Sequence, residues 1–286
     1  MSLELYIVIV NFNAGPELGR CLASVREHTG AVEWEAVVVD NASTDGSEVI
    51  ARGADGRFAL VRNTENVGFA RAVNQGVRLT SAPFVLLLNP DGYLLPGAVG
   101  ELLHEMQTTA TCGVAAPAVV DDAGGTDRNA RGDPNLITGF FGRSTWLTRR
   151  FPNSALARRN VITSAPPAGD TGLDVDWVTG SCMLVRRAAF DAVDGLDERY
   201  FMYWEDADFC RRLRLAGWRV RYRPAALVSH SGGLSSRSAS QLANRAFHDS
   251  AYLYYRTHVA RSALSPLRWL AWLLLHVRSW WRGRSL

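Results

Sequence analysis

The chain has 286 residues, of which 47% are hydrophobic and 21% charged, so it can bury the core of one large domain or of two small ones. Its four cysteines show no CxxC spacing, which favours free thiols over disulfides or a structural zinc site. The net charge is only +3 and the sequence carries no recognisable nucleic-acid-binding motif, so nucleic acid is not an expected partner.

The first third of the chain alternates short apolar runs with segments of helical periodicity. Strands are predicted over residues 5–10, 35–39, 58–62 and 84–88, and helices over 17–28, 47–52 and 70–79. Short links between each strand and the next helix are typical of a parallel sheet with helices on both faces. The first strand follows the N-terminus directly, without the pattern of a secretory leader, which predicts a cytoplasmic protein.

Beyond residue 96 the alternation is weaker. We expect a strand over 114–120, a strand pair over 175–187 with Gly180 and Ser181 at its bend, a helix over 205–216, and short strands over 218–222 and 226–228. Residues 121–172 are rich in glycine, proline and polar side chains and predict long loops with a short helical piece, a candidate lid over a site.

The C-terminal part, residues 237–286, has a different composition. It holds eight arginines and one aspartate, and all 31 basic residues of the chain are arginine. Residues 264–281 are strongly apolar but are interrupted by Arg268, His276 and Arg278, so they fall short of a membrane span. An amphipathic helix lying in the membrane interface is favoured. The alternative is a helix packed on the protein's own core or on a second copy of the chain in a homodimer.

One strand ends in a way that indicates a site. The wholly apolar run of residues 84–88 is followed by Asn89, Pro90 and Asp91. Pro90 lacks the amide that would continue the ladder, so Asp91 lies at the carboxyl edge of the sheet, where open α/β folds bind ligands. A carboxylate there can hold a divalent cation against a phosphate. A turn in which Asp91 faces water fits the segment equally well.

Two further loops at the same predicted edge suit a nucleotide. Asp40 also ends an apolar strand and could accept the imide N–H of a uracil or thymine ring, although a turn or helix cap explains it as easily. Residues 66–71 place Gly68 and backbone amides at a helix N-terminus, with Arg71 in its first turns, which suits a diphosphate. Gly68 alone indicates no more than a turn.

Three acids, Glu205, Asp206 and Asp208, begin a predicted helix. The helix dipole favours acids there, but aromatic neighbours such as Trp204 indicate a partly desolvated cleft. Burial would raise the pKa of such a carboxyl toward a value useful for a general base. Finally, His230 follows a strand end, where its imidazole could complete a metal shell begun by Asp91, although a lone histidine is more often structural.

Taken in order, these motifs resemble those of the family-2 glycosyltransferases, and more narrowly their rhamnosyltransferase-like branch. The resemblance covers about residues 5–236 and rests on residues 11–13, 40–46, 66–70 with Asn74 and Gly76, 88–91, 180–181, 205–208 and 230. It implies a GT-A fold of the α/β class, with a mostly parallel nucleotide-sugar-binding half (1–96) flanked by helices, an acceptor-binding and catalytic half (97–236), and the amphipathic helical extension (237–286).

The resemblance also implies an activity, which is inverting transfer of a sugar from a nucleotide-diphosphate donor, assisted by Mg²⁺ or Mn²⁺. Within that branch the expected donor is dTDP-rhamnose. The expected acceptor is a hydroxyl of a polyprenyl-linked saccharide, in bacterial cell-envelope polysaccharide synthesis at the cytoplasmic face of the inner membrane.

The same resemblance assigns roles to residues. Asp206 matches the catalytic base, Asp91 and His230 match the metal-binding residues, and Asp40 matches the acid that reads the base. Trp204, Glu205 and Asp208 fall on the acceptor side, and the nucleotide-sugar set is Asn11, Asn13, Asp40, Asn66, Gly68, Arg71, Asn74, Asn89, Gly180 and Ser181. Asn89 replaces the first acid of the family's DxD motif, so the metal shell has one charge fewer.

Three alternatives remain beside this interpretation. The same fold could use a UDP-sugar donor, or it could be a non-catalytic saccharide-binding scaffold, against which the retained acids argue. An NAD-dependent oxidoreductase is disfavoured because no GxGxxG follows the first strand.

Overall fold

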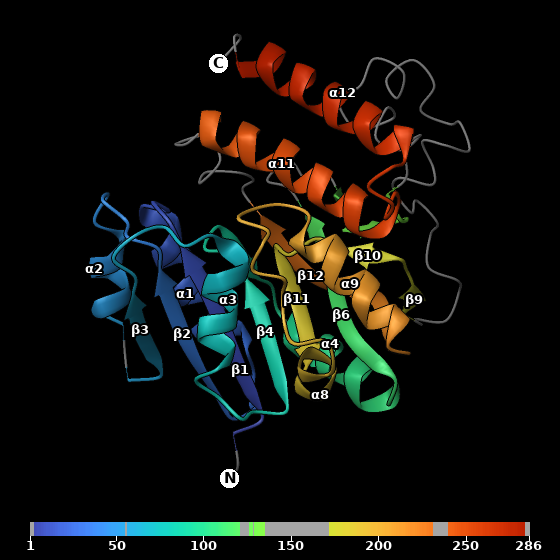
Figure 1. The fold of residues 1–286 in the computed structure, drawn as a ribbon. Helices are drawn as coiled ribbons and strands as arrows, with labels where there is room; N and C mark the ends of the chain where they lie inside the picture. The colour runs from blue at the N-terminus through green and yellow to red at the C-terminus, as the bar shows by residue number, and fades with distance from the viewer. Residues whose placement is uncertain are drawn as a thin grey trace.

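The computed structural model describes residues 3–54, 56–120, 126–127, 129–134, 172–230 and 240–283. Most of its strands join one ten-stranded sheet, and the two C-terminal helices lie beyond one end of it (Figure 1). In spatial order its strands are β3 (Phe58–Arg62), β2 (Trp34–Asp40), β1 (Leu5–Asn11), β4 (Phe84–Leu88), β11 (Cys182–Arg186), β6 (Cys112–Val120), β12 (Arg219–His230) and β5 (Gly92–Leu94), while β7 (Thr126–Asp127) pairs with β6 and β9 (Leu173–Asp174) with β12.

The N-terminal half is parallel, as its sequence predicts. Strands β3, β2, β1 and β4 pair in parallel, with Leu5 opposite Trp34 on one side and Phe84 on the other. Because β1 and β4 are buried on both faces, they read as continuous apolar runs. Their connections carry α1 (Pro16–His28), α2 (Ser47–Arg52) and α3 (Phe69–Val77).

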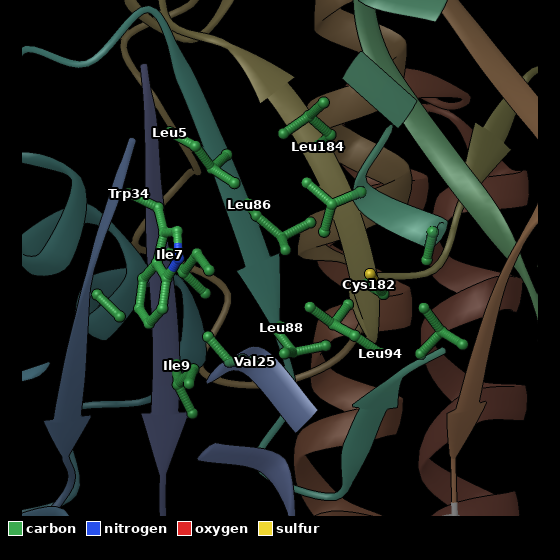
Figure 2. Packing of buried hydrophobic residues seen from close by; sticks show 14 of the residues in the cluster. Leu5, Ile7, Ile9, Val25, Trp34, Leu86, Leu88, Leu94, Cys182 and Leu184 are labelled. Atoms are coloured by element: carbon green, nitrogen blue, oxygen red, sulfur yellow. The ribbon is translucent and has the colours of Figure 1, made fainter. Parts of the chain in front are cut away.

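Helices cover both faces of the sheet and divide the core into two layers. Alternate residues of β1 point to opposite sides, so Leu5, Ile7 and Ile9 pack in one layer with α1 and α4 (Ala98–Thr108). Figure 2 shows these three side chains beside those of β4 and β11. Their neighbours in β1, such as Val8, pack in the other layer with α3, α8 (Arg187–Ala192) and α9 (Glu205–Leu215). All four cysteines are buried free thiols, as predicted.

The second half of the sheet is mixed, and it corrects two predictions. Residues 175–187 do not form a strand pair, because β10 (Trp177–Val178) pairs with β8 (Ala130–Arg131) in a separate small sheet while β11 lies antiparallel between β4 and β6. Gly180 and Ser181 therefore connect two sheets instead of closing a hairpin. The two short strands predicted over 218–228 form one strand, β12, whose register shifts between Arg223 and Leu227 around Pro224, which has no amide for the ladder.

Two further segments beyond residue 96 bear on the predictions made from sequence. Helix α4 lies in the segment whose weak pattern gave no prediction, and the proposed lid over 121–172 falls mainly outside the described residues.

Two helices close the chain and lie across one end of the sheet. Figure 1 shows α11 (Ser240–His258) between the sheet and the outer helix α12 (Pro266–Gly283). Residue Ala271 is the buried hydrophobic side chain of α12, and it packs with Tyr255 and Ala260. Within the described part of the chain, no helix is long and apolar enough to cross a membrane.

Candidate active site

The carboxyl ends of β1 and β2 are joined by a buried polar cluster. Asn11 ends β1, and its side-chain amide donates to Asp40 Oδ1 at 2.7 Å, and it also contacts the hydroxyls of Ser43 and Ser47. The second oxygen of Asp40 accepts the Ser43 backbone amide at 3.1 Å. Both side chains are fully buried. Asn11 and Asp40 therefore hold two loops together, and the role of Asp40 in reading a nucleotide base stays a prediction.

Asn13 strengthens the same junction. It lies in the left-handed region with φ 52°, its backbone amide donates to Ser43 Oγ at 3.0 Å, and its side-chain oxygen accepts the amide of Thr44 at 2.8 Å. The loops after β1 and β2 are thus fixed before any nucleotide arrives, which is the preorganisation that a binding site requires.

Two backbone amides at the start of α3 have partners within the chain. The Gly68 amide donates to Asn66 Oδ1 at 3.0 Å, and the Phe69 amide donates to the carbonyl of Phe201 at 2.8 Å. A Cβ at Gly68 would lie 2.5 Å from that same carbonyl oxygen, so glycine is required by the close approach of the two chains. The amides of Gly68 and Phe69 therefore already have partners in the chain, and a diphosphate contact by residues 66–71 stays a prediction.

Arg71 and Asn74 on α3 also have partners within the chain. The side chain of Asn74 donates to the carbonyl of Leu196 at 2.8 Å and accepts its amide at 3.0 Å. Arg71 is half exposed and pairs with Glu198 at 3.2 Å. Asn74 therefore joins α3 to the segment before α9. Donor contacts by either residue stay predictions, and Arg71 would have to leave a surface ion pair to make one.

Asp91 and His230 are brought together by the sheet. Strand β5 pairs antiparallel with the end of β12, which places His230 opposite Gly92. His230 Nε2 consequently lies 3.1 Å from Asp91 Oδ1, and the Asp91 side chain is 7% exposed. The strand that ends at Leu88 and the strand that ends at His230 thus deliver a carboxylate and an imidazole to the same point.

Asn89 and Ser181 connect this pair to the rest of the site. Antiparallel pairing sets Cys182 opposite Leu88, and the Asn89 amide donates to the carbonyl of Ser181 at 2.9 Å. The preceding Gly180 donates its amide to Asp206 Oδ2, also at 2.9 Å. Five of the predicted residues, in segments 89–91, 180–181 and 206, are therefore linked by neighbouring backbone contacts.

Asp206 has the environment of a general base. Its second oxygen accepts the Ala207 amide at 2.8 Å, so both oxygens are oriented by backbone donors. Burial raises the pKa of this carboxyl, while the amides of Gly180 and Ala207 and the charge of Arg131 lower it. The net rise moves the pKa toward neutrality, where a carboxylate is most effective as a base, as the sequence led us to expect.

The residues next to Asp206 at the start of α9 point in different directions. Glu205 is 6% exposed, and burial together with the charge of Asp206 raises its pKa well above the usual value. Asp208 points elsewhere, because it accepts a hydrogen bond from Arg212 at 2.7 Å and lies 2.6 Å from His258 Nε2 at the end of α11. Trp204 likewise stacks on α11, with its ring centroid 5.4 Å from that of Tyr254. Asp208 and Trp204 thus anchor the helix, and the predicted contact with an acceptor gains no support from these positions.

Sequence reasoning missed two residues near Asp206. Arg131 interacts electrostatically with its carboxylate but lies in a segment that the sequence indicated only as loop. Phe201 contacts the start of α3 through its backbone carbonyl, which accepts the Phe69 amide. A backbone contact of this kind cannot be recognised from the type of side chain. Arg131 lies between two stretches rich in glycine and aspartate, and no sequence motif there could have identified it.

The pair Asp91 and His230 fits a divalent cation of the Mg²⁺ or Mn²⁺ kind. No group of three or more histidine, cysteine or acidic side chains with metal-binding geometry occurs among the described residues. However, Mg²⁺ is commonly held by one or two protein ligands together with substrate phosphates and water. His230 Nε2 is buried and lies 3.1 Å from Asp91 Oδ1, so an imidazole nitrogen and a carboxylate oxygen stand close enough to turn toward one cation.

Comparison with known proteins places these features in a family. The model described as "Glycosyl transferase family 2" matches residues 6–193. An N-acetylglucosaminyl-diphospho-decaprenol L-rhamnosyltransferase of Mycobacterium tuberculosis is 33% identical over 100% of this chain and 94% of its own length. The rhamnosyltransferase WbbL of Escherichia coli K12 is 52% identical over 64 residues, which are 22% of this chain and 24% of that protein.

Solved structures show the fold. GalNAc-T7 with UDP, GalNAc and Mn²⁺ gives a TM-score of 0.58 at 16% identity, over 80% of this chain and 44% of that one. The mannosyltransferase PcManGT of Pyrobaculum calidifontis, with GDP-Man and Mn²⁺, gives a TM-score of 0.57 at 16% identity. The match covers 98% of this chain and 72% of that one. The predicted GT-A fold is confirmed.

Proposed function

The chain belongs to glycosyltransferase family 2, and from that premise we propose that it transfers rhamnose from dTDP-rhamnose to a lipid-linked saccharide, with inversion at the anomeric carbon. The observation that carries the proposal is the linkage of Asp206 to Asp91 and His230 through Gly180, Ser181 and Asn89. A base and a phosphate-side cation site on one edge of a sheet are what a single displacement requires. The rhamnosyltransferase named in M. tuberculosis, matched over 94% of its length, supports the choice of sugar and of a polyprenyl diphosphate-linked N-acetylglucosamine as acceptor.

The chemistry needs one base. Asp206, held by the amides of Gly180 and Ala207, takes the proton from the acceptor hydroxyl as the oxygen attacks the anomeric carbon. The bond from that carbon to the diphosphate breaks on the opposite face, which inverts the configuration. Because the backbone fixes both oxygens of Asp206, little reorganisation is needed when the hydroxyl approaches.

Asp91 and His230 would hold a divalent cation against the donor diphosphate. When bound, such an ion neutralises the charge that the leaving diphosphate gains. Asn89 lies beside this pair with a neutral side chain, so the protein supplies one carboxylate. Asn11, Asp40 and Asn13 lie at the adjacent strand ends, and we assign them to the walls of the nucleotide pocket.

The acceptor's lipid anchor requires the enzyme to work at a membrane, and α12 supplies a surface for it. Its residues Leu270, Leu273, Leu274, Val277 and Trp281 are all exposed, and the helix contains no acidic side chain. Apolar and tryptophan side chains with flanking arginines suit an interfacial helix on an anionic membrane. We therefore place the enzyme at the cytoplasmic face of the inner membrane, as a peripheral protein.

A transfer assay tests the proposal. Purified protein with Mn²⁺ is incubated with dTDP-rhamnose or with UDP-sugars, using polyprenyl-diphospho-N-acetylglucosamine in detergent as acceptor, and the lipid product is analysed by mass spectrometry. We expect a mass increase of one deoxyhexose with dTDP-rhamnose alone. Transfer from a UDP-sugar instead would replace the donor assignment, and neither transfer nor donor hydrolysis with any nucleotide sugar would favour a non-catalytic scaffold.

A further inference from the structure

Three neighbouring strands end in a row of polar side chains. In the parallel register, Asn11 at the end of β1 lies opposite Asp40 at the end of β2, and Asp40 lies opposite Arg62, the last residue of β3. The Asn11 amide donates to Asp40 Oδ1 on one side, and Arg62 Nε lies 3.8 Å from Asp40 Oδ2 on the other. Strand pairing therefore places a guanidinium next to the buried acid of the predicted nucleotide site.

Arg62 is the member of this row that a ligand can reach. The side chains of Asn11 and Asp40 are fully buried, whereas 48% of the Arg62 side chain is exposed. The backbone beneath it is fixed, since the amide of Asn63 donates to the Asp40 carbonyl at 2.8 Å. A molecule that binds at these strand ends therefore meets the guanidinium of Arg62 before it meets the acid.

The guanidinium is held in place by charge. Besides Asp40, it faces Glu48 at the start of α2, whose Oε1 lies 3.7 Å from Arg62 Nη2. This separation and the 3.8 Å from Nε to Asp40 are both too long for a hydrogen bond. An arginine carries five N–H donors in a fixed fork. The two acids thus orient the fork while leaving its donors available to a ligand.

The same two acids decide what kind of group fits. Their charges outweigh the single positive charge of Arg62, so a phosphate at this point would be repelled. A neutral carbonyl oxygen accepts hydrogen bonds without that repulsion. The exposed end of Arg62 therefore suits an uncharged ligand group that carries carbonyl oxygens.

The position of Arg62 in the sheet agrees with this choice. The strand order places β3 three strand spacings, roughly 14 Å, from β4, which leads to Asp91. A nucleoside diphosphate whose phosphates lie at Asp91 and His230 can extend along the strand ends over such a length. Its base then reaches Arg62, and thymine and uracil both carry two ring carbonyls beside an imide N–H.

We propose that Arg62 is a nucleobase-binding residue of the donor site, whose guanidinium donates to a ring carbonyl of thymine or uracil while Asp40 and Glu48 hold it in place. The inference rests on the proposed function for the identity of the ligand. It applies to a dTDP-sugar and to a UDP-sugar, since both bases carry the same carbonyls. It assigns recognition of the base to an exposed side chain that lies outside the motifs on which the family resemblance rests.

Binding of two probes tests this directly. Isothermal titration calorimetry with Mn²⁺ present measures dTDP, which carries the base, and inorganic pyrophosphate, which does not, on the wild type and on Arg62→Met. Methionine keeps an unbranched stem but has no donor. We expect the dTDP affinity to fall about 10–100-fold, the effect of losing a hydrogen bond from a charged group. The pyrophosphate affinity should stay at the wild-type value, because the phosphate site lies more than a Debye length away.

Arg245→Met is the matched control. Arg245 on α11 also lies 3.7 Å from a carboxylate, that of Asp249, but it is 82% exposed on a helix and belongs to no strand end. Its replacement removes the same charge and the same kind of long ion pair. Both affinities should therefore equal those of the wild type.

Each outcome decides the role of Arg62. Unchanged dTDP affinity in Arg62→Met would make the arginine a surface ion pair only, and an equal loss for dTDP and pyrophosphate would show that it acts on the phosphates through its charge. Either result overturns the proposal, as does a wild type that binds neither dTDP nor UDP. A protein that binds dTDP or UDP through Arg62 but transfers no sugar would count against the proposed function and uphold the assignment of Arg62.

Discussion

At the scale of single residues, Asn89 determines how many charges the protein offers a cation. It stands two positions before Asp91, where the DxD motif of the resembling family has an acid, and its backbone is fixed by Ser181. Its side chain is half-buried and makes no hydrogen bond within the described residues. A carboxylate at this position would therefore meet no competing partner in the described structure, and its charge would be available to a cation.

We predict that Asn89→Asp tightens Mn²⁺ binding by roughly tenfold in the presence of dTDP, because one added charge near a cation contributes about 1 kcal/mol or more at an effective dielectric between protein and water. Asp91→Asn should lower the affinity by at least as much. Isothermal titration calorimetry measures both. Equal affinities in the three proteins would remove Asp91 from the metal site.

Glu205 makes a second prediction at this scale, concerning pH. Its pKa is raised well above 4.5 in the folded state, first by burial and then by the charge of Asp206. Between about 4.5 and the folded pKa, the folded protein binds more protons than the unfolded chain, so the free energy of unfolding decreases as pH rises.

Glu205→Gln should therefore flatten this decrease, since glutamine does not titrate. Urea unfolding at a series of pH values above 4.5 measures it, and the exposed Glu65→Gln is the control, in which the wild-type slope should persist. A slope that is the same in Glu205→Gln and in the wild type would contradict the assignment of a buried, proton-binding Glu205.

At the scale of elements, the start of α3 and the turn before α9 are fitted to each other. Gly68 has φ 88° and ψ 168°, and the backbone of Phe201 lies so close that a Cβ at Gly68 would be 2.5 Å from its carbonyl oxygen. The following residues Tyr203 and Trp204 both have φ 68°, so the turn that presents Asp206 is itself strained. Such strain persists only where the surroundings enforce it, and the contacts with α3 and α11 do so here.

Gly68→Ala should destabilise the protein by about 3 kcal/mol or more, because it adds a steric clash with the Phe201 carbonyl to an unfavourable backbone conformation. Gly97→Ala is a close control. Gly97 also precedes a helix with positive φ, 80°, but a Cβ there meets no atom within 4 Å. Its loss should be about 1 kcal/mol by chemical denaturation. Similar losses in the two variants would show that the approach of Phe201 is unimportant.

The elements that could be predicted from sequence are those with local signals. The four parallel strands and their helices follow from apolar runs and short polar links, and Asp91 and Asp206 follow from acids at element ends. The pairing of β11 between β4 and β6 could not be predicted, because it depends on contacts between distant segments. The contacts of Gly68 and Asn74 within the chain could not be predicted for the same reason, since their partners Phe201 and Leu196 lie more than a hundred residues away.

At the scale of the whole molecule, the outer helix leaves a wide apolar surface beside a basic one. Packing on α11 accounts for the narrow stripe around Ala271, together with a hydrogen bond from Asn244 to the Ser279 carbonyl at 3.0 Å. Leu273 remains 51% exposed and Trp281 68%. Burial against the protein's own core, one of the sequence-based alternatives, thus explains only one side of α12.

We predict that Leu270→Gln with Leu274→Gln weakens binding to vesicles of phosphatidylglycerol and phosphatidylcholine by roughly 10–100-fold, since burial of two half-exposed leucines contributes about 1.5–3 kcal/mol. Co-sedimentation measures the partition. The control pair is Leu79→Gln with Leu215→Gln, two exposed leucines in the turn after α3 and at the end of α9, and it should bind as the wild type does. Equal loss with both pairs, or dimer dissociation in place of membrane release, would argue against a membrane surface on α12.

The central claim is that Asp206 is the base of a sugar-transfer reaction on this fold, and its replacement by asparagine tests that most directly. The amide keeps the shape and retains an acceptor for the Gly180 amide, but it cannot take a proton. Transfer from dTDP-rhamnose to polyprenyl-diphospho-N-acetylglucosamine should fall by about 10²–10⁴-fold in Asp206→Asn, while calorimetry shows a nearly unchanged donor affinity. The exposed Asp191→Asn should keep full activity. Near-normal turnover in Asp206→Asn would contradict the account.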